Sequence, residues 1–200
     1  SRFFMRAIGF NNNEINIKEP FKGLFTQGMV CHETFKNDNN EWLSPDEVFT
    51  DNGKDFFKIK DKKKVLVGPS ESMSKSKRNT IDPEKIMDQY GADAVRFFIL
   101  SDSPPEKDIQ WSDTGVSSAY KFLQKVWDLN YEISERSEKR INSSENENFL
   151  KKINSIVSKI DNAINNFRFN VAIAQFYEVQ KYFKNNLQKE ISNDCLKSNI

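Results

Sequence analysis

The chain has 200 residues, of which 37% are hydrophobic and 12% aromatic, and its formal net charge at pH 7 is +1. A chain of this length forms one or two domains with a proper core. The composition excludes both a disordered polyelectrolyte and a uniformly basic nucleic-acid coat protein, so any affinity for a polyanion must be local.

The first residues, "SRFFMRAIGF", predict a helix because their apolar residues recur on one face. They lack the apolar core and cleavage site of a signal peptide, and we expect this helix to belong to the interior of a longer chain. After Gly23, the β-branched and aromatic residues of "LFTQGMVCHETF" predict a strand. The stretch of about residues 36–66 is typical of short strands and turns, with Asn52-Gly53 as a hairpin turn, and we interpret it as a small insertion.

Two helices are predicted further along the chain. Asp82 can cap the free amide groups of a first turn, and Pro83 follows where its missing N–H costs nothing. Gly91 ends this helix because glycine enters the left-handed region easily. A second, more buried helix, "AVRFFIL", comes next, and Pro104-Pro105 prevents it from continuing.

The last part of the chain has no proline, and its apolar residues recur at helical spacing in three stretches: residues 113–133, 149–167 and 171–187. Helices of this length joined by short links pack as an antiparallel bundle. The polar segment 134–148 is predicted to be a loop.

The composition changes sharply near residue 110, and we therefore predict two regions, residues 1–110 and residues 111–200. Trp111 and Trp127 are predicted to anchor the core of the second region, because tryptophan is usually buried.

The cysteines and the histidine exclude several kinds of site. Cys31, Cys195 and the single histidine, His32, form neither a disulfide framework nor a zinc pattern, so we expect no protein-bound metal and a cytoplasmic protein. We interpret His32 as structural. No apolar run approaches the ~20 residues of a membrane span, so we expect no membrane association.

The segment "VGPSESMSKSKRNTIDPEK", residues 67–85, is the strongest candidate for a site. Small hydroxyl residues alternate with basic ones, so the backbone can move while several side chains offer donors to one acceptor-rich target. Phosphate oxygens fit that target, and lysine acts there as a mobile point charge. The alternative is an exposed loop kept polar for solubility, or a basic targeting run.

The order of residues favours phosphate binding. "MSKS", then Lys-Arg-Asn, then "IDPEKIMDQYGADAVRFFILSDSPPEKDIQW" resembles the signature loop and following helices of class I aminoacyl-tRNA synthetases, and within that class the leucyl enzymes most. "SRFFMRAI", "EPFKGLFTQGMVCHETF", "WLSPDEV" and "NFRFNVAIAQFYEV" carry the same resemblance. These segments span nearly the whole chain in the family's order.

The resemblance implies an α/β region followed by an all-α region. Residues 1–110 would form the C-terminal part of a Rossmann-like nucleotide-binding catalytic domain with a small β insertion. Residues 111–200 would form all or part of a helical tRNA (anticodon)-binding bundle. The complete enzyme would join leucine to ATP, giving leucyl-adenylate and pyrophosphate, and transfer the leucine to tRNA(Leu). ATP would bring Mg²⁺ on its phosphates, and we expect a monomer.

The resemblance also implies roles for individual residues. Lys75 would stabilise the pyrophosphate leaving group, and the ATP-binding loop would consist of Ser72, Met73, Ser74, Lys75 and Ser76, with Lys77, Arg78 and Asn79 as auxiliary residues. The family has lysine at the position of Ser72, so the chain has one cation fewer here unless Lys77 or Arg78 compensates. In the bundle, tRNA phosphates would be contacted by Lys151, Lys152, Lys159 and Arg168.

Two alternatives remain open from the sequence. The enzyme could act on isoleucine, valine or methionine, or the chain could be a non-catalytic RNA-binding module derived from a synthetase. The family's His-X-Gly-His motif, most of the leucine pocket and the proofreading domain have no counterpart among these residues. We therefore expect the isolated 200 residues to be inactive.

Overall fold

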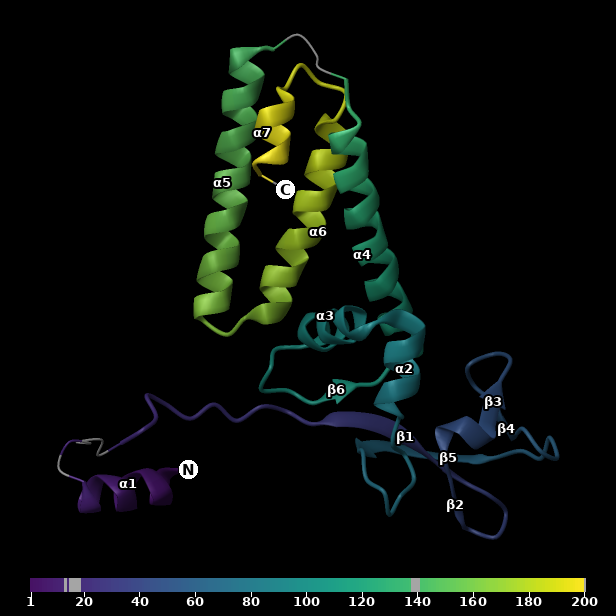
Figure 1. Ribbon diagram of the computed structural model, residues 1–200. Helices are drawn as coiled ribbons and strands as arrows, with labels where there is room; N and C mark the ends of the chain where they lie inside the picture. The colour runs from purple at the N-terminus through teal and green to yellow at the C-terminus, as the bar shows by residue number, and fades with distance from the viewer. Residues whose placement is uncertain (13, 15–18, 138–140, 200) are drawn as a thin grey trace.

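A computed structural model describes residues 1–12, 14, 19–137 and 141–199. It begins with helix α1 (Arg2–Asn11), which confirms the predicted helix. None of the α1 residues is buried, and in Figure 1 the helix lies apart from the rest of the chain. Residues 19–29 form no helix or strand and lead into strand β1 (Val30–Lys36), which begins later than the Gly23 of the prediction. No helix in the described ranges is long and apolar enough to cross a membrane.

Strand β1 is the centre of a mixed four-stranded sheet. It pairs antiparallel with β2 (Trp42–Leu43) and β5 (Leu66–Ser72), and parallel with β6 (Ile109–Gln110). The register places Cys31 opposite Ser72 and Val30 opposite Ile109. The end of β5, where the serine-rich loop begins, is therefore fixed beside the start of β1.

The connection to β6 depends on a close backbone approach at Gly28. Its N–H donates to the carbonyl of Pro105 at 2.8 Å, and a Cβ at this position would lie only 2.0 Å from the Lys107 carbonyl oxygen. Any side chain here would have to push the backbones apart. The N–H of Met29 next donates to Oδ1 of Asp108 at 2.8 Å, so the approach continues directly into the parallel pair.

Between β1 and β5 the chain forms the short elements expected of the insertion. They are β2, the 3₁₀ helix η1 (Pro45–Glu47), and a hairpin of β3 (Val48–Thr50) and β4 (Phe56–Lys58). The hairpin turn contains Asn52-Gly53, as predicted: the side chain of Asn52 accepts from the N–H groups of Lys54 and Asp55. Phe35, Leu43 and Val65 form a small core that joins these elements to the sheet.

Two helices follow the loop, α2 (Pro83–Tyr90) and α3 (Ala92–Asp102). The Asp82 side chain accepts from the N–H of Glu84, and Gly91 separates the helices with a φ of +80°, so both predicted boundaries are confirmed. Because α2 is capped at its first turn, the residues just before it are held at a defined place.

The remaining helices are α4 (Asp113–Ser134), α5 (Ser143–Asn165), α6 (Phe169–Asn186) and α7 (Asn193–Lys197). The three long ones run antiparallel, with α7 beside them (Figure 1). Their shared core includes Leu129, Ile133, Phe149, Ile153, Phe183 and Leu196. The predicted loop 134–148 is wrong at Ser134, the last residue of α4, and over residues 143–148, which are helical because the Asn142 side chain caps α5; residues 138–140 lie outside the described ranges.

The bundle packs on the α/β part through aromatic side chains. Phe97 of α3 stacks on Phe122 of α4 with ring centroids 5.1 Å apart, and Tyr177 of α6 covers both rings. Trp111 is half-buried against Phe98, but Trp127 is 78% exposed, so its predicted core position is wrong. The fold class, a mixed α/β part followed by an all-α bundle, is confirmed; the domain boundary at residue 110 remains a prediction.

Candidate functional site

The serine-rich loop connects β5 to α2 and begins beside β1. Ser72 is the exposed last residue of β5, and the N–H of Met73 donates to the carbonyl of Val30 at 3.1 Å. Ser74 is half-buried, whereas Lys75 and Ser76 are exposed. The structure therefore places all five residues of the predicted ATP-binding loop in one short segment at the edge of the sheet.

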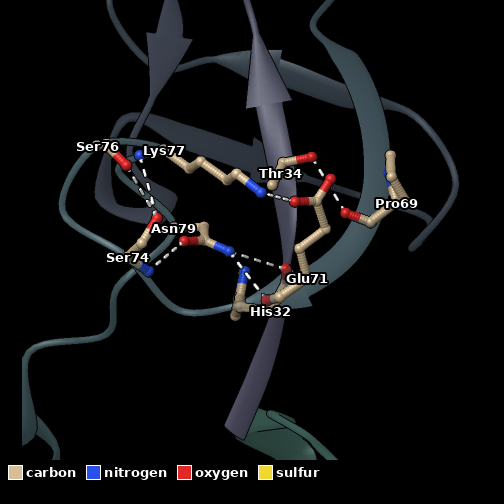
Figure 2. Close-up of polar contacts among 8 residues, drawn as sticks. All are labelled: His32, Thr34, Pro69, Glu71, Ser74, Ser76, Lys77 and Asn79. Carbon is tan, nitrogen blue, oxygen red and sulfur yellow. Dashed lines mark hydrogen bonds and ion pairs between the residues drawn. The ribbon is translucent and has the colours of Figure 1, made fainter. Parts of the chain in front are cut away.

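Asn79 anchors this loop to the sheet and is completely buried. Its Oδ1 accepts from the N–H of Ser74 at 2.9 Å, and its Nδ2 donates to the carbonyls of His32 at 3.2 Å and Glu71 at 3.1 Å (Figure 2). Both side-chain donors and the acceptor of the amide are thus used. Asn79 contacts strands β1 and β5, rather than the start of α2.

The residues between these anchors form a compact turn. The hydroxyls of Ser74 and Ser76 lie 3.3 Å apart, and the N–H of Lys77 points to Oγ of Ser74 at 3.4 Å (Figure 2). The N–H of Arg78 donates to the carbonyl of Lys75 at 3.3 Å, with Arg78 in the left-handed region at φ +55°. The loop is therefore folded on itself.

The three cations of the loop have different surroundings. Lys77 forms an ion pair with Glu71 of β5 (Figure 2). Arg78 contacts Glu47 of η1 at 2.9 Å and the Trp42 carbonyl at 3.1 Å. Within the described ranges, the Lys75 amine has neither a hydrogen bond nor an ion pair. Lys75 is therefore the loop cation that can reach a ligand without breaking an existing contact.

A neighbouring lysine on α2 is also engaged. Nζ of Lys85 lies 2.7 Å from Oδ2 of Asp46, and this hydrogen bond raises the pKa of the Lys85 amine. Both groups are well exposed, so the pair is screened by solvent and contributes little to stability. It does not touch the loop.

The groups that the loop presents are chemically suited to a phosphate. It combines one free ammonium group with two hydroxyls and backbone N–H groups on a turn, which suits several oxygens of one anion. The described residues contain no group of three His, Cys, Asp or Glu side chains that could hold a metal ion.

A second candidate surface lies between α5 and α6. Two adjoining hollows share Lys159 and Gln175, and we call them the α5–α6 groove. The side chains that line it are mostly cations and amides: Lys152, Lys159, Arg168, Lys181, Asn162, Asn166, Gln175 and Asn185. Three of the four predicted bases lie here, and Lys151 does not line the groove. Lys181 was missed because the sequence does not show which faces of α5 and α6 meet.

Sequence reasoning also missed the acidic partners of the loop. Glu71 and Glu47 belong to β5 and to the insertion, and neither stands in the signature motif. The antiparallel pairing of β1 and β5 and the fold of η1 bring them beside the loop. The motif alone carries no signal for such tertiary contacts.

Residues 64–112, which include the loop, match the family described as tRNA synthetases class I (I, L, M and V). The loop and the two helices that follow it thus resemble those of class I aminoacyl-tRNA synthetases.

Leucine–tRNA ligases resemble the chain over most of its length. That of Hyphomonas neptunium is 45% identical over 181 residues (89% of the chain, 21% of the relative), and that of Rickettsia typhi is 42% identical over 194 residues (97% and 23%). The Zymomonas mobilis enzyme is 41% identical over 179 residues (90% and 20%). The chain is thus similar to leucine–tRNA ligases over most of its own length, and it spans about a fifth of the length of these relatives.

A solved structure has the same fold. It is the LeuRS of Agrobacterium radiobacter K84 in a ternary complex with tRNA and LeuAMS. The TM-score is 0.65 at 22% identity, and the match covers 100% of this chain and 22% of that one. The relatives confirm the predicted resemblance to the leucyl enzymes, and this structure confirms the fold.

Proposed function

We propose that the full-length protein activates leucine with ATP, forming leucyl-adenylate and pyrophosphate, and transfers the leucine to tRNA(Leu). The described chain contributes the ATP-phosphate loop and helices that bind tRNA. One observation carries this proposal: within the described ranges the Lys75 amine makes no hydrogen bond or ion pair, on a turn that Asn79 fixes to the sheet, while Lys77 and Arg78 are already paired. The similarity to leucine–tRNA ligases supports it.

The proposed role of Lys75 follows from the charge changes of adenylate formation. A carboxylate oxygen of leucine attacks the α-phosphorus of ATP, and the bond from this phosphorus to the pyrophosphate oxygen breaks. Negative charge then accumulates on pyrophosphate. A positioned ammonium group stabilises this charge more than that of bound ATP, which lowers the barrier. Ser74 and Ser76 would donate to phosphate oxygens or hold the turn.

Mg²⁺ on the triphosphate would neutralise part of the same charge. The described residues offer no cluster of metal ligands, so its ligands would be phosphate oxygens and water. The protein's own contribution to this step is then the ammonium of Lys75 and the hydroxyl groups beside it.

The proposed tRNA contact is the α5–α6 groove. Four cations line it, and the acidic residue among its lining is Glu178. Side-chain amides between the cations can also donate to phosphate and ribose oxygens. The LeuRS of similar fold was solved with tRNA, which supports this assignment. We further propose a monomeric, cytoplasmic enzyme; the free cysteines, Cys31 and Cys195, are typical of a reducing compartment.

The test is leucine-dependent exchange of pyrophosphate into ATP by the full-length protein. Lys75→Ala should slow this exchange by roughly 100- to 1,000-fold, the effect of losing one transition-state donor, with little change in leucine affinity. Lys85→Ala is the matched control, since Lys85 lies on α2 and contacts Asp46 outside the loop. An undiminished rate in Lys75→Ala would refute the role of Lys75.

The same assay separates the alternatives. Exchange that depends on isoleucine, valine or methionine in place of leucine would assign the enzyme to a neighbouring specificity. Absence of exchange with all four amino acids, together with RNA binding, would indicate a non-catalytic module. We also propose that the isolated 200 residues give no exchange.

A further inference from the structure

Arg78 is held by two acceptors from one short segment of the insertion. Its Nη2 lies 2.9 Å from Oε2 of Glu47, and its Nη1 donates to the carbonyl of Trp42 at 3.1 Å. A guanidinium group presents its donors in a rigid fork, so two contacts on one group fix its orientation as well as its position. A lysine amine could not reproduce this geometry.

Glu47 is oriented before it meets Arg78. Its Oε2 also accepts from the N–H of Ser44 at 2.8 Å, while its own N–H donates to the Ser44 carbonyl at 2.9 Å. This capping box holds the carboxylate in place. The ion pair therefore costs less side-chain entropy than one between two freely rotating groups, even though both partners are partly exposed.

The position of Arg78 is transmitted to Lys75 through the backbone. The N–H of Arg78 donates to the carbonyl of Lys75, and Arg78 has a φ of +55°, a conformation that non-glycine residues rarely adopt. Because both terminal nitrogens of the Arg78 guanidinium are bound, the side chain helps to retain this backbone conformation. Releasing the clamp frees the turn whose other end carries Lys75.

We infer that Glu47 is a positioning residue for adenylate formation: it clamps Arg78 in the insertion, which keeps the 75–78 turn closed and aims Lys75 at the phosphates. This inference rests on the proposed function. It also assigns different roles to the loop cations. The Arg78 guanidinium is held against Glu47 and is not available to the phosphates, so it does not replace the lysine that the family has at the position of Ser72. Lys75 acts through its own charge.

The test compares isosteric variants of two adjacent carboxylates in the full-length protein. Glu47→Gln should lower kcat for leucine-dependent exchange by about three- to tenfold, the size expected for one charge-assisted contact, with an unchanged KM for leucine. Asp46→Asn removes the neighbouring ion pair to Lys85, which does not touch the loop, and should leave exchange unchanged. Arg78→Lys keeps the charge without the fork and should match Glu47→Gln.

A double variant distinguishes positioning from a general loss of stability. In a Lys75→Ala background, Glu47→Gln should reduce the residual exchange no further, because Glu47 acts through Lys75. Fully additive losses, or no loss in the single variants, would overturn the inference. Should Glu47→Gln fail to fold, Arg78→Lys provides the same comparison.

Limited trypsin digestion gives a readout that does not depend on activity. Trypsin must take the Arg78 side chain into its specificity pocket, so the clamp should protect the bond after Arg78. Glu47→Gln should increase cleavage at this bond severalfold relative to wild type, and Asp46→Asn should not. Equal cleavage after Arg78 in wild type, Glu47→Gln and Asp46→Asn would overturn the inference that Glu47 holds Arg78. The proposed function fails separately, if wild type shows no leucine-dependent exchange.

Discussion

The amide oxygen of Asn79 and the backbone N–H of Ser74 are joined by a 2.9 Å hydrogen bond that closes the loop around Lys75. A serine-rich loop is thereby converted into a turn with fixed ends. The two donors on the same Asn79 amide reach back to β1 and β5, so the turn and the sheet share one buried side chain. Only the exposed part of the loop, centred on Lys75, is left to adapt to a ligand.

We predict that Asn79→Ala loosens this turn. The substitution leaves the Ser74 N–H and two carbonyls without their partner, a loss of about 1–3 kcal/mol for a buried group. Amide hydrogen exchange at Ser74 should therefore become faster by about 5- to 150-fold, since local opening becomes easier. Mass spectrometry of loop peptides from the full-length protein measures this rate.

The matched control for that measurement is Asn52→Ala in the exposed β3–β4 turn. It should leave exchange at Ser74 unchanged. Unaltered protection of the loop in Asn79→Ala would show that Asn79 is not its anchor.

A second prediction concerns Ser72, where the family has lysine. Ser72 is exposed at the end of β5, so a longer side chain can be accommodated there. Ser72→Lys adds a cation near Lys75 and should lower KM for ATP by about two- to fivefold at low ionic strength, because an exposed charge interacts weakly through water. The gain should shrink as salt is added, since the Debye length falls to ~8 Å at 0.15 M.

Initial rates of pyrophosphate exchange at several ATP concentrations check this. Ser118→Lys, an exposed change on α4, controls for the net charge of the protein. Equal KM values for Ser72→Lys and wild type at low salt would mean that position 72 does not face the triphosphate.

The parts of the fold that the sequence predicts well are those decided by neighbouring residues. Asp82 and Gly91 bound α2 as expected because a cap and a left-handed terminator act within one turn. Lys75 could be proposed as a site residue from the sequence because the motif that contains it is contiguous. The ion pair between Arg78 and Glu47 could not be predicted from the sequence, because Glu47 reaches the loop only after the insertion has folded.

Trp127 shows a different limit. Its spacing fits a helix, but the buried face of α4 is set by Phe122, Leu129 and Ile133. Trp127 precedes Leu129 by two residues, which places it about 200° around the helix from that face. Helical periodicity indicated the correct element, and the packing of α3, α6 and α7 decided which residues of α4 are covered.

The α5–α6 groove gives a third prediction. Lys159→Ala and Lys181→Ala should each weaken binding of tRNA(Leu) and reduce the slope of log K against log salt by about 0.7–0.9, the value for one phosphate contact. Filter binding or fluorescence titration over a range of salt concentrations measures this slope. Leucine-dependent pyrophosphate exchange without tRNA should not change.

Lys151→Ala is the control for the groove, because Lys151 is exposed on α5 but does not line it. The same loss of affinity in all three variants would indicate a diffuse electrostatic effect. Unchanged affinity in Lys159→Ala and Lys181→Ala would move the tRNA contact to another face of the bundle.

The fourth prediction is that the bundle loses stability in alkaline solution. Burial raises the pKa of the Cys195 thiol above its ordinary value of 9.0, and it also raises the pKa of Tyr177 and Tyr182 above 10.0. The folded state therefore binds these protons more tightly than the unfolded state. Their contribution is complete below the unfolded pKa values and is lost as the pH rises through the folded ones.

Thermal unfolding followed by circular dichroism between pH 7 and 11 should show an unfolding temperature that decreases as the pH rises above 9. In Cys195→Ala this temperature should decrease less steeply with pH just above pH 9. The thiol itself gives an independent measurement, since only the thiolate reacts with iodoacetamide. At pH 8.5, Cys195 should react more slowly in the folded protein than in the denatured one. Equal rates, together with the same pH dependence in Cys195→Ala, would contradict the raised pKa.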